Sequence, residues 1–290
     1  MTSILLGLLA AIAALFGTAL VSTAHRRGAL KPRAEAVALG AVTNFFDALG
    51  IGSFAPTTAW MKLRRLLPDS HIPATLNVGH CLPTIAQGLI FIKLVQVDPA
   101  LLSACIAAAV AGSLVGAPVV LRMPVSVVQA VVGCALLVAA GLFALTNLGL
   151  MPGGGTALAL PAGPFAFAVA VHFVLGALMT FGIGLYAPSL VTLSLLGLNP
   201  LAAFPIMMGA CAFLMPACGL RFLRAERIDL RIALGLAVGG VPLVLVAAFV
   251  VKSLPLVALR WGVVAVVIYA ALLLLRSAAR RPEPIPGGTT

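Results

Sequence analysis

The stretch that decides the fold is the motif GIGSFAPT at residues 50–57, which recurs as GIGLYAPS at residues 182–189. Further matched residues follow each copy at nearly the same offset. In order along the chain, Gly79, Cys81, Asp98 and Pro124 match Gly209, Cys211, Asp229 and Pro255. One unit of about 131 residues is therefore duplicated, and we place its copies at residues 34–148 and 164–275.

The composition around these motifs excludes a water-soluble protein. Of the 290 residues, 62% are hydrophobic and 9% are charged, whereas soluble domains carry about 25% charged residues. The apolar residues fall in blocks of about 20, which is the length needed to cross a bilayer. We therefore predict an all-α polytopic membrane protein. Its net charge of +11 lies between the apolar blocks, where it reports topology rather than contact with nucleic acid.

Three segments lie outside the repeats. In residues 1–33 the positive charges follow the apolar stretch, which is the reverse of a signal peptide. We predict a membrane helix there, with its N-terminus outside and a basic cytoplasmic loop after it. Residues 149–163 form a linker rich in Gly and Pro, and residues 276–290 form a basic cytoplasmic tail. The five cysteines lie in apolar blocks without metal-ligand spacing, so we expect small buried apolar residues rather than disulfides.

Each repeat opens with an apolar stretch, at residues 34–67 or 164–197, that is too long for one membrane span and too short for two. As a single helix it would measure about 51 Å, against a hydrocarbon core of about 30 Å. The GIG sequence near its middle breaks a helix, and the proline that follows suits the first turn of a new one. We predict two half-helices that form a re-entrant hairpin, followed by three transmembrane helices in each repeat.

The distribution of Lys and Arg orients these hairpins. If each hairpin returns to the side it entered from, the basic residues of segments 24–34, 60–72 and 221–231 share one side with Arg122 and the tail. Only Lys93 and Lys252 then lie opposite. The positive-inside rule makes the basic side cytoplasmic, and a hairpin plus three spans turns the second repeat upside down. We predict seven spans, two hairpins and two inverted repeats in the cell inner membrane. The loop at residues 152–155 is then outside and the C-terminus cytoplasmic.

The two glycine breaks are the candidate substrate site. Inverted repeats bring them together near the membrane midplane, where irregular backbone persists only if it is buried in protein or lines a cavity. Each second half-helix points its N–H groups and the positive end of its dipole inward, an arrangement that binds anions. The predicted substrate-binding residues come from the motifs and the helices that follow them: Gly50, Gly52, Ser53, Phe54, Thr57, Asn77, Cys81, Gly182, Gly184, Tyr186, Ser189 and Cys211.

The alternative role for such glycines is close helix packing. GxxxG spacing predicts this role for Gly112 with Gly116 and for Gly235 with Gly239. Packing glycines would not require the same Ala-Pro-[Ser/Thr] continuation in both motifs, so we favour the functional interpretation for the motifs. Thr58 adds a further hydroxyl donor beside the first break.

Asp47 is the only carboxylate well inside an apolar block, and its counterpart in the second repeat is Met179. An acid within the membrane is costly and indicates a coupling or substrate site. We predict Asp47 and His80 as coupling residues, with Asn44, one turn before Asp47, as the partner of the acid. For Asp47 the alternative is a locally bonded structural acid, and for His80 and His172 it is a hydrogen-bonded structural histidine.

The duplicated motif, with Gly79 and Gly209 on the helices that follow, resembles the TauE/SafE family of sulfite and sulfonate transporters, also called the 4-toluene sulfonate uptake permease family. The resemblance covers about residues 34–275. It implies a secondary transporter, expected to work as an exporter, for sulfite, an organosulfonate or a related small anion, with alternating access around a midplane site. An anion channel and a transporter of a non-sulfur organic anion remain the alternatives.

The expected partners are a small anionic substrate, protons and the lipid bilayer, and a homo-oligomer is left open. We expect no cofactor, no metal and no nucleic acid. We also expect no enzymatic activity, because four scattered histidines and one buried acid do not make a catalytic cluster.

Overall fold

The computed structural model describes residues 2–150, 155–225 and 227–250, together with residues 261, 264–265, 268, 271–272, 275–276 and 278–279. Several predicted features lie outside these residues: most of the external loop at residues 152–155, Lys252, Pro255 and most of the basic tail.

Within the described residues the protein is helical, with an isolated bridge between Ala157 and Leu198 and no β-strand. A 3-10 turn, η1, covers Asp69–His71. The helices are α1 (Thr2–Arg26), α2 (Ala34–Asp47), α3 (Phe54–Leu63), α4 (Ile72–Gly79), α5 (Cys81–Leu94), α6 (Pro99–Arg122), α7 (Val125–Asn147), α8 (Ala162–Met179), α9 (Tyr186–Leu195), α10 (Pro200–Arg224) and α11 (Leu230–Val250). The predicted all-α class is confirmed.

Six described segments are long and apolar enough to cross a membrane: α1, Asp69–Leu94, α6, α8, α10 and α11. They fit a polytopic membrane protein. The sequence predicts α8 as one arm of a hairpin, yet at 18 residues it reaches the length of a span. Its counterpart α2 has 14 residues. The two predicted hairpins therefore differ in the length of their first arm.

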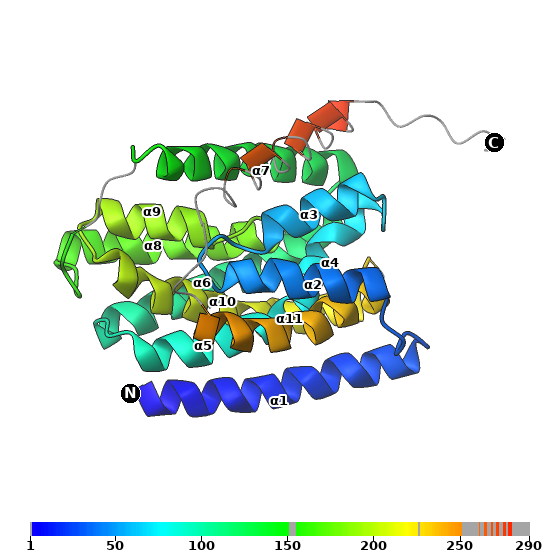
Figure 1. Ribbon diagram of the computed structural model, residues 1–290, viewed down its shortest axis with the longest axis horizontal. Coiled ribbons are helices and arrows are strands. Elements are labelled where there is room, and N and C mark those ends of the chain that lie inside the picture. The colour runs from blue at the N-terminus through cyan, green and yellow to red at the C-terminus, as the bar shows by residue number, and fades with distance from the viewer. Residues whose placement is uncertain are drawn as a thin grey trace.

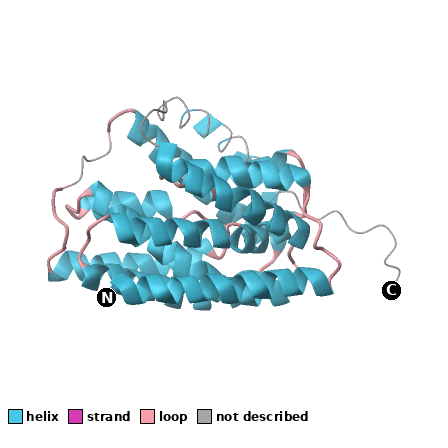
Figure 2. Cartoon of the chain, turned by 60° about the horizontal axis from the view of Figure 1, so that its bottom comes forward, coloured by secondary structure: helices cyan, strands magenta, loops and turns pink. Residues whose placement is uncertain are grey.

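The helices run in broadly similar directions, and most of their connections lie at the two ends of the bundle (Figure 2). α1 lies along one flank and α7 along the opposite flank (Figure 1). In the most apolar 18-residue stretch of α1 only 17% of the residues are buried, whereas in that of α10 the share is 83%. A helix that is apolar on all sides is stable where protein surrounds it. α10 is therefore the central helix, and the exposed apolar face of α1 suits contact with lipid.

Two helix pairs pack closely enough to require glycine. A Cβ on Gly239 of α11 would lie 1.9 Å from the carbonyl oxygen of Val37 on α2. A Cβ on Gly112 of α6 would likewise lie 1.9 Å from the carbonyl oxygen of Phe173 on α8. Gly116 and Gly235 are similarly close to the facing helix. The packing role predicted from GxxxG spacing is confirmed, and the first arm of each hairpin packs on a helix of the other repeat.

The start of α2 and the end of α3 lie together. Glu35 Oε1 accepts hydrogen bonds from Trp60 Nε1 at 3.0 Å and from Arg64 Nε at 2.9 Å. Arg33 Nη1 donates to the carbonyl of Leu66 at 3.1 Å. The two helices therefore fold back on each other, and we call residues 34–63 hairpin 1.

The segment before α8 and the end of α9 lie together in the same way. The backbone N–H of Asn199 donates to the carbonyl of Ala157 at 2.8 Å, and that of Gly155 donates to the carbonyl of Leu198 at 3.2 Å. We call residues 162–195 hairpin 2.

The open ends of the hairpins contact different loops. Arg33, at the open end of hairpin 1, forms an ion pair of 3.5 Å with Asp229, which begins α11. Leu158, at the open end of hairpin 2, accepts a hydrogen bond from the N–H of Asp98, which begins α6. Since α10 begins after Asn199 at one open end and ends before the loop that holds Asp229 at the other, these ends lie at opposite ends of the bundle, as α3 and α9 do in Figure 1.

Candidate functional site

The first break separates α2 from α3 and is made by two glycines with left-handed backbone. Gly50 has φ of 82° and Gly52 has φ of 86°, a conformation that costs other residues roughly 1–2 kcal/mol. The N–H of Gly50 closes the end of α2 by donating to the carbonyl of Asp47 at 2.9 Å. The chain then turns, and α3 begins at Phe54.

The second break has one left-handed glycine. Gly182 has φ of 88°, and its N–H donates to the carbonyl of Met179 at 2.9 Å. Gly184 does not adopt positive φ. The motifs are therefore alike at their first glycine and differ at their second.

The two breaks meet inside the protein. A Cβ on Gly184 would lie 3.7 Å from Cβ of Phe54, the first residue of α3. Phe54 and Tyr186 begin α3 and α9, and both are buried. The N-terminal ends of the two second arms therefore lie near one another, away from either open end.

A chain of hydrogen bonds joins the two breaks through Gln87 of α5. Gln87 Nε2 donates to Asp47 Oδ2 at 2.7 Å, and the hydroxyl of Tyr186 donates to Gln87 Oε1 at 2.7 Å. The hydroxyl and N–H of Ser53 also interact with the Asp47 carboxylate. All four side chains are buried. The buried acid is therefore satisfied by polar groups from two segments, the first break and α5, as a carboxylate in a low dielectric requires.

The prediction that Asn44 is the partner of Asp47 is wrong. Asn44 Nδ2 donates to the carbonyl of Gly40 at 2.8 Å, and Asn44 Oδ1 lies 3.0 Å from His80 Nδ1. Asn44 lies one helical turn from Asp47, but its side chain faces His80, between α4 and α5. Gln87 and Ser53 are the groups that contact the acid.

A histidine contacts the hydroxyl at the same motif position in each repeat. His80 Nε2 lies 3.1 Å from Thr57 Oγ1, and His172 Nε2 lies 3.0 Å from Ser189 Oγ. His172 Nδ1 lies 2.7 Å from the carbonyl of Ala168. A carbonyl only accepts, so Nδ1 carries the proton and Nε2 accepts from the serine hydroxyl. Both histidines are hydrogen-bonded in the interior, which fits the alternative structural role.

The remaining predicted residues gather around Met179. Asn77 Nδ2 donates to the carbonyl of Met179 at 3.0 Å, and Cys211 Sγ lies 3.4 Å from Met179 Sδ. Cys218 Sγ lies 3.6 Å from Asn77 Oδ1, and the buried Cys81 lies near Cys218. Four of the five cysteines are buried as predicted, whereas Cys134 is exposed. Cys81, Cys211 and Cys218 therefore lie together near Asn77 and Met179, next to the second break.

Of two further polar residues in this region, Thr58 was predicted from the sequence as a hydroxyl donor and Gln87 was not. Gln87 sits in an apolar helix without any motif, so its link between the breaks is visible only in three dimensions. Thr58 Oγ1 is buried without a hydrogen-bond partner, one helical turn beyond Phe54 on the same face of α3. It is a hydroxyl donor that the protein leaves unused beside the breaks.

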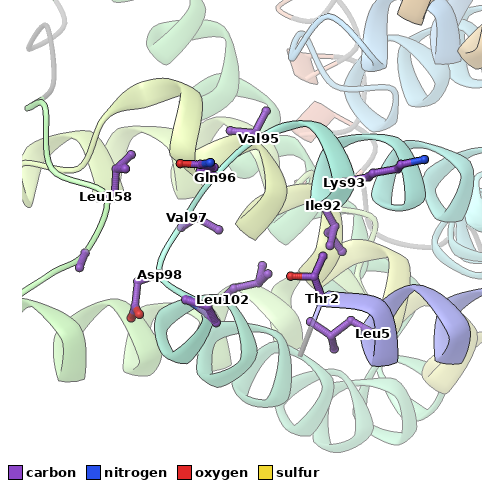
Figure 3. A pocket seen from close by; sticks show the side chains of 12 residues that line it. Thr2, Leu5, Ile92, Lys93, Val95, Gln96, Val97, Asp98, Leu102 and Leu158 are labelled. Carbon is purple, nitrogen blue, oxygen red and sulfur yellow. The ribbon is translucent and has the colours of Figure 1, made fainter.

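A cavity of about 440 Å³ lies elsewhere, at the open end of hairpin 2 (Figure 3). Its lining combines charged and polar side chains, Lys93, Gln96 and Asp98, with apolar ones such as Leu5 and Leu158. Asp98 also accepts the N–H of Leu101 at the start of α6. The cavity contains no residue of either break.

Comparisons with protein-family models, with curated proteins and with solved structures find no match for this chain.

Proposed function

We propose that this protein is a secondary transporter that carries a small anion through the site between its two glycine breaks. The observation that supports this most strongly is the buried connection of both breaks through Asp47, Gln87 and Tyr186. Irregular backbone at membrane depth persists only where it is buried in protein or lines a cavity, and an acid at that depth is costly and indicates a functional site. The resemblance of the motifs to the TauE/SafE family suggests sulfite, an organosulfonate or a related anion.

Inverted repeats are part of the proposal, and matched contacts support them. A Cβ on Gly50 would meet Phe204 and Met207 of α10, whereas one on Gly182 would meet Pro73 and Leu76 of α4. Phe204 follows Pro73, and Met207 follows Leu76, by the same offset that separates the matched residues of the sequence repeat. Exchanging the two repeats therefore exchanges the two contacts. Together with hairpins that open at opposite ends, this is the pattern of a duplicated unit inverted in the membrane.

The charges support an orientation. Arg27, Arg33 and Arg64 lie at the open end of hairpin 1, and Lys93 lies at the open end of hairpin 2. By the positive-inside rule hairpin 1 enters from the cytoplasm and hairpin 2 from outside. The cavity beside Lys93 is then external.

The proposed site binds an anion through backbone and hydroxyl donors. The first turns of α3 and α9 direct N–H groups and partial positive charge toward the region where Phe54 and Gly184 meet. The unused hydroxyl of Thr58 adds a donor, and the hydroxyl of Tyr186, which donates to Gln87, lies beside the same region. Oxyanions of sulfur offer several acceptor oxygens and suit such a set of donors.

Asp47 is proposed to carry the coupling proton. Outward movement of a monoanion from a negative-inside cell is already favoured by about 2.3 kcal/mol per 100 mV, so export needs no coupling ion, whereas import does. Replacing Asp47 with Asn should preserve exchange of labelled for unlabelled anion and abolish transport driven by a pH gradient. A variant that responds to the gradient like the parent would make Asp47 structural.

The proposal is tested first by ligand binding to purified protein. A bound ligand raises the melting temperature by mass action, so a screen of sulfite, thiosulfate, sulfoacetate, taurine and simple carboxylates should yield a stabilising anion. Gly52→Leu and Gly184→Leu should abolish that stabilisation while the protein remains monodisperse. Normal stabilisation of both variants would mean that the anion binds elsewhere.

Counterflow in proteoliposomes then separates a carrier from a channel. A carrier should accumulate labelled anion against excess unlabelled anion inside, with a saturable rate. An anion channel would instead give currents that do not saturate in this way, and that result would contradict the proposal.

A further inference from the structure

The direction of each hydrogen bond between the breaks follows from chemistry. A carboxylate can only accept, so Gln87 must turn its Nε2 group toward Asp47, as it does at 2.7 Å. That orientation leaves Gln87 Oε1, which can only accept, facing Tyr186. The Tyr186 hydroxyl is therefore obliged to donate its proton to Gln87.

We propose that Gln87 is a positioning residue that couples a proton on Asp47 to anion binding at Tyr186. When Asp47 Oδ2 carries a proton it becomes a donor, and a half-turn of the Gln87 amide places Oε1 to accept it. Nε2 then points at the Tyr186 oxygen and donates to it. The Tyr186 proton is released from Gln87 and becomes available to an anion. This inference deepens the proposed function and rests on it.

The surroundings of the chain permit this exchange. Rotation of an amide about its last bond changes no volume, because its oxygen and NH₂ group are nearly the same size. The Tyr186 oxygen also interacts with Thr84, which leaves its own proton as the group that can change partner. Tyr186 begins α9 two residues beyond Gly184, so its hydroxyl belongs to the region where the breaks meet.

Few polar or charged groups contact Asp47. Ser53 from the first break and Gln87 from α5 hold the carboxylate, and Tyr186 of α9 and Cys211 of α10 are the titratable groups that it influences. Among the described residues, no Arg or Lys forms an ion pair with Asp47. Protonation is therefore the change by which the direction of this hydrogen-bond chain reverses.

The consequence is that one proton binds together with one anion. By linkage, anion affinity then rises as pH falls, by up to about tenfold per pH unit. Repulsion of the anion by the Asp47 charge alone would also make the affinity depend on pH, but that dependence would not require Gln87.

The test compares variants of the full-length protein by methanesulfonate binding between pH 5 and pH 8, since this probe stays a monoanion throughout. Gln87→Met keeps the volume and removes the acceptor, so the Tyr186 hydroxyl should be free at every pH. We expect tight binding at pH 8 and a slope less than half that of the parent. Tyr186→Phe should also lose the slope but bind weakly at every pH. The loop variant Gln96→Met is the matched control and should behave as the parent.

Tight binding by Gln87→Met and weak binding by Tyr186→Phe, each with a flattened dependence of affinity on pH, support the coupling through Gln87. A merely structural role would weaken binding by both variants alike. A Gln87→Met protein that keeps the slope of the parent overturns the inference and leaves Asp47 acting through its charge. If Gln87→Met does not fold, Tyr186→Phe with an unchanged slope overturns it equally. A parent that binds methanesulfonate without pH dependence overturns only this inference. A parent that binds no anion overturns the proposed function as well.

Discussion

Hairpin 1 and hairpin 2 share one motif but differ in chemistry at the break. The first break holds two left-handed glycines and a carboxylate, Asp47, bound by Ser53 and Gln87. The second holds one left-handed glycine and the thioether of Met179 in the place of the acid. The two breaks therefore share a left-handed turn at their first glycine, while the carboxylate lies at the first break.

This difference suggests that the two hairpins have different roles. In hairpin 1 the donors of Ser53 at the N-terminal end of α3 are occupied by the protein's own carboxylate. In hairpin 2 the residue in the place of Asp47 is Met179, an uncharged thioether, so the second break carries no carboxylate of its own. We infer that hairpin 1 carries the proton and hairpin 2 the larger share of the anion contacts.

The largest expected effect is a difference in thermal stability between variants of the two histidines. His80→Leu leaves Asn44 Oδ1 and the Thr57 hydroxyl without their partner, whereas His172→Leu deprives only Ser189 of a side-chain partner. Each unsatisfied buried polar group costs about 1–3 kcal/mol, so His80→Leu should lower the melting temperature about twice as much. Thermal unfolding of both purified variants measures this. Equal losses would mean that hairpin 1 is no more dependent on its polar network than hairpin 2.

The next effect should be the same in both hairpins. A Cβ on Gly40 would lie 2.4 Å from the carbonyl oxygen of Leu236, and one on Gly176 would lie 2.1 Å from that of Ala109. Gly40→Ala and Gly176→Ala should each destabilise by about 1–3 kcal/mol through overpacking. Gly7→Ala in α1 is the control, because nothing lies within 4 Å of its Cβ. The same thermal measurement applies, and an undisturbed melting temperature for either variant would contradict this packing.

A smaller effect distinguishes the second glycines of the motifs. Gly52→Ala meets no atom within 4 Å but must adopt φ of 86°, which costs roughly 1–2 kcal/mol. Gly184→Ala makes an ordinary contact of 3.7 Å with Phe54 and carries no backbone strain, so it should change stability little. Equal melting temperatures for the two variants would show that the breaks share one conformation.

The smallest effect lies at the open ends. Hydrogen bonds from Arg64 and Trp60 lower the pKa of Glu35 below its usual 4.5, so its folded-state advantage exists at neutral pH and is lost as the pH falls through that lowered pKa. The described contacts that join the two arms at the open end of hairpin 2 are backbone hydrogen bonds, which do not titrate. Trp60 fluorescence should therefore change on acidification in the parent and not in Glu35→Gln. An acid response retained by the variant would assign the titration to another group.

The sequence predicted what local patterns determine. Glycine and proline spacing predicted the two breaks, and GxxxG spacing predicted the contacts of Gly112 and Gly239, because both depend on backbone geometry near the residue itself. It also indicated that Asp47, an acid in an apolar block, must find partners in the interior, and the structure buries it beside Gln87; its coupling role stays a prediction.

The partners themselves were not predictable in this way. Gln87 lies 40 residues from Asp47 and 99 from Tyr186, and no periodicity links them. Asn44 was chosen because it lies one turn from Asp47, yet helix packing turned it toward His80. Which side chain completes a buried network depends on how helices from both repeats meet, and that is a property of the tertiary structure.

The central claim is that hairpins 1 and 2 open to opposite sides of the membrane, and cysteine labelling tests it most directly. Gly28→Cys, Ser70→Cys and Ala159→Cys are introduced singly into a background without the native cysteines. An impermeant maleimide is then added outside intact cells. We expect position 159 to react, and positions 28 and 70 to react only after the membrane is permeabilised. Reaction of position 70 in intact cells with position 28 still protected would mean that residues 34–67 cross the membrane, and would contradict the inverted arrangement.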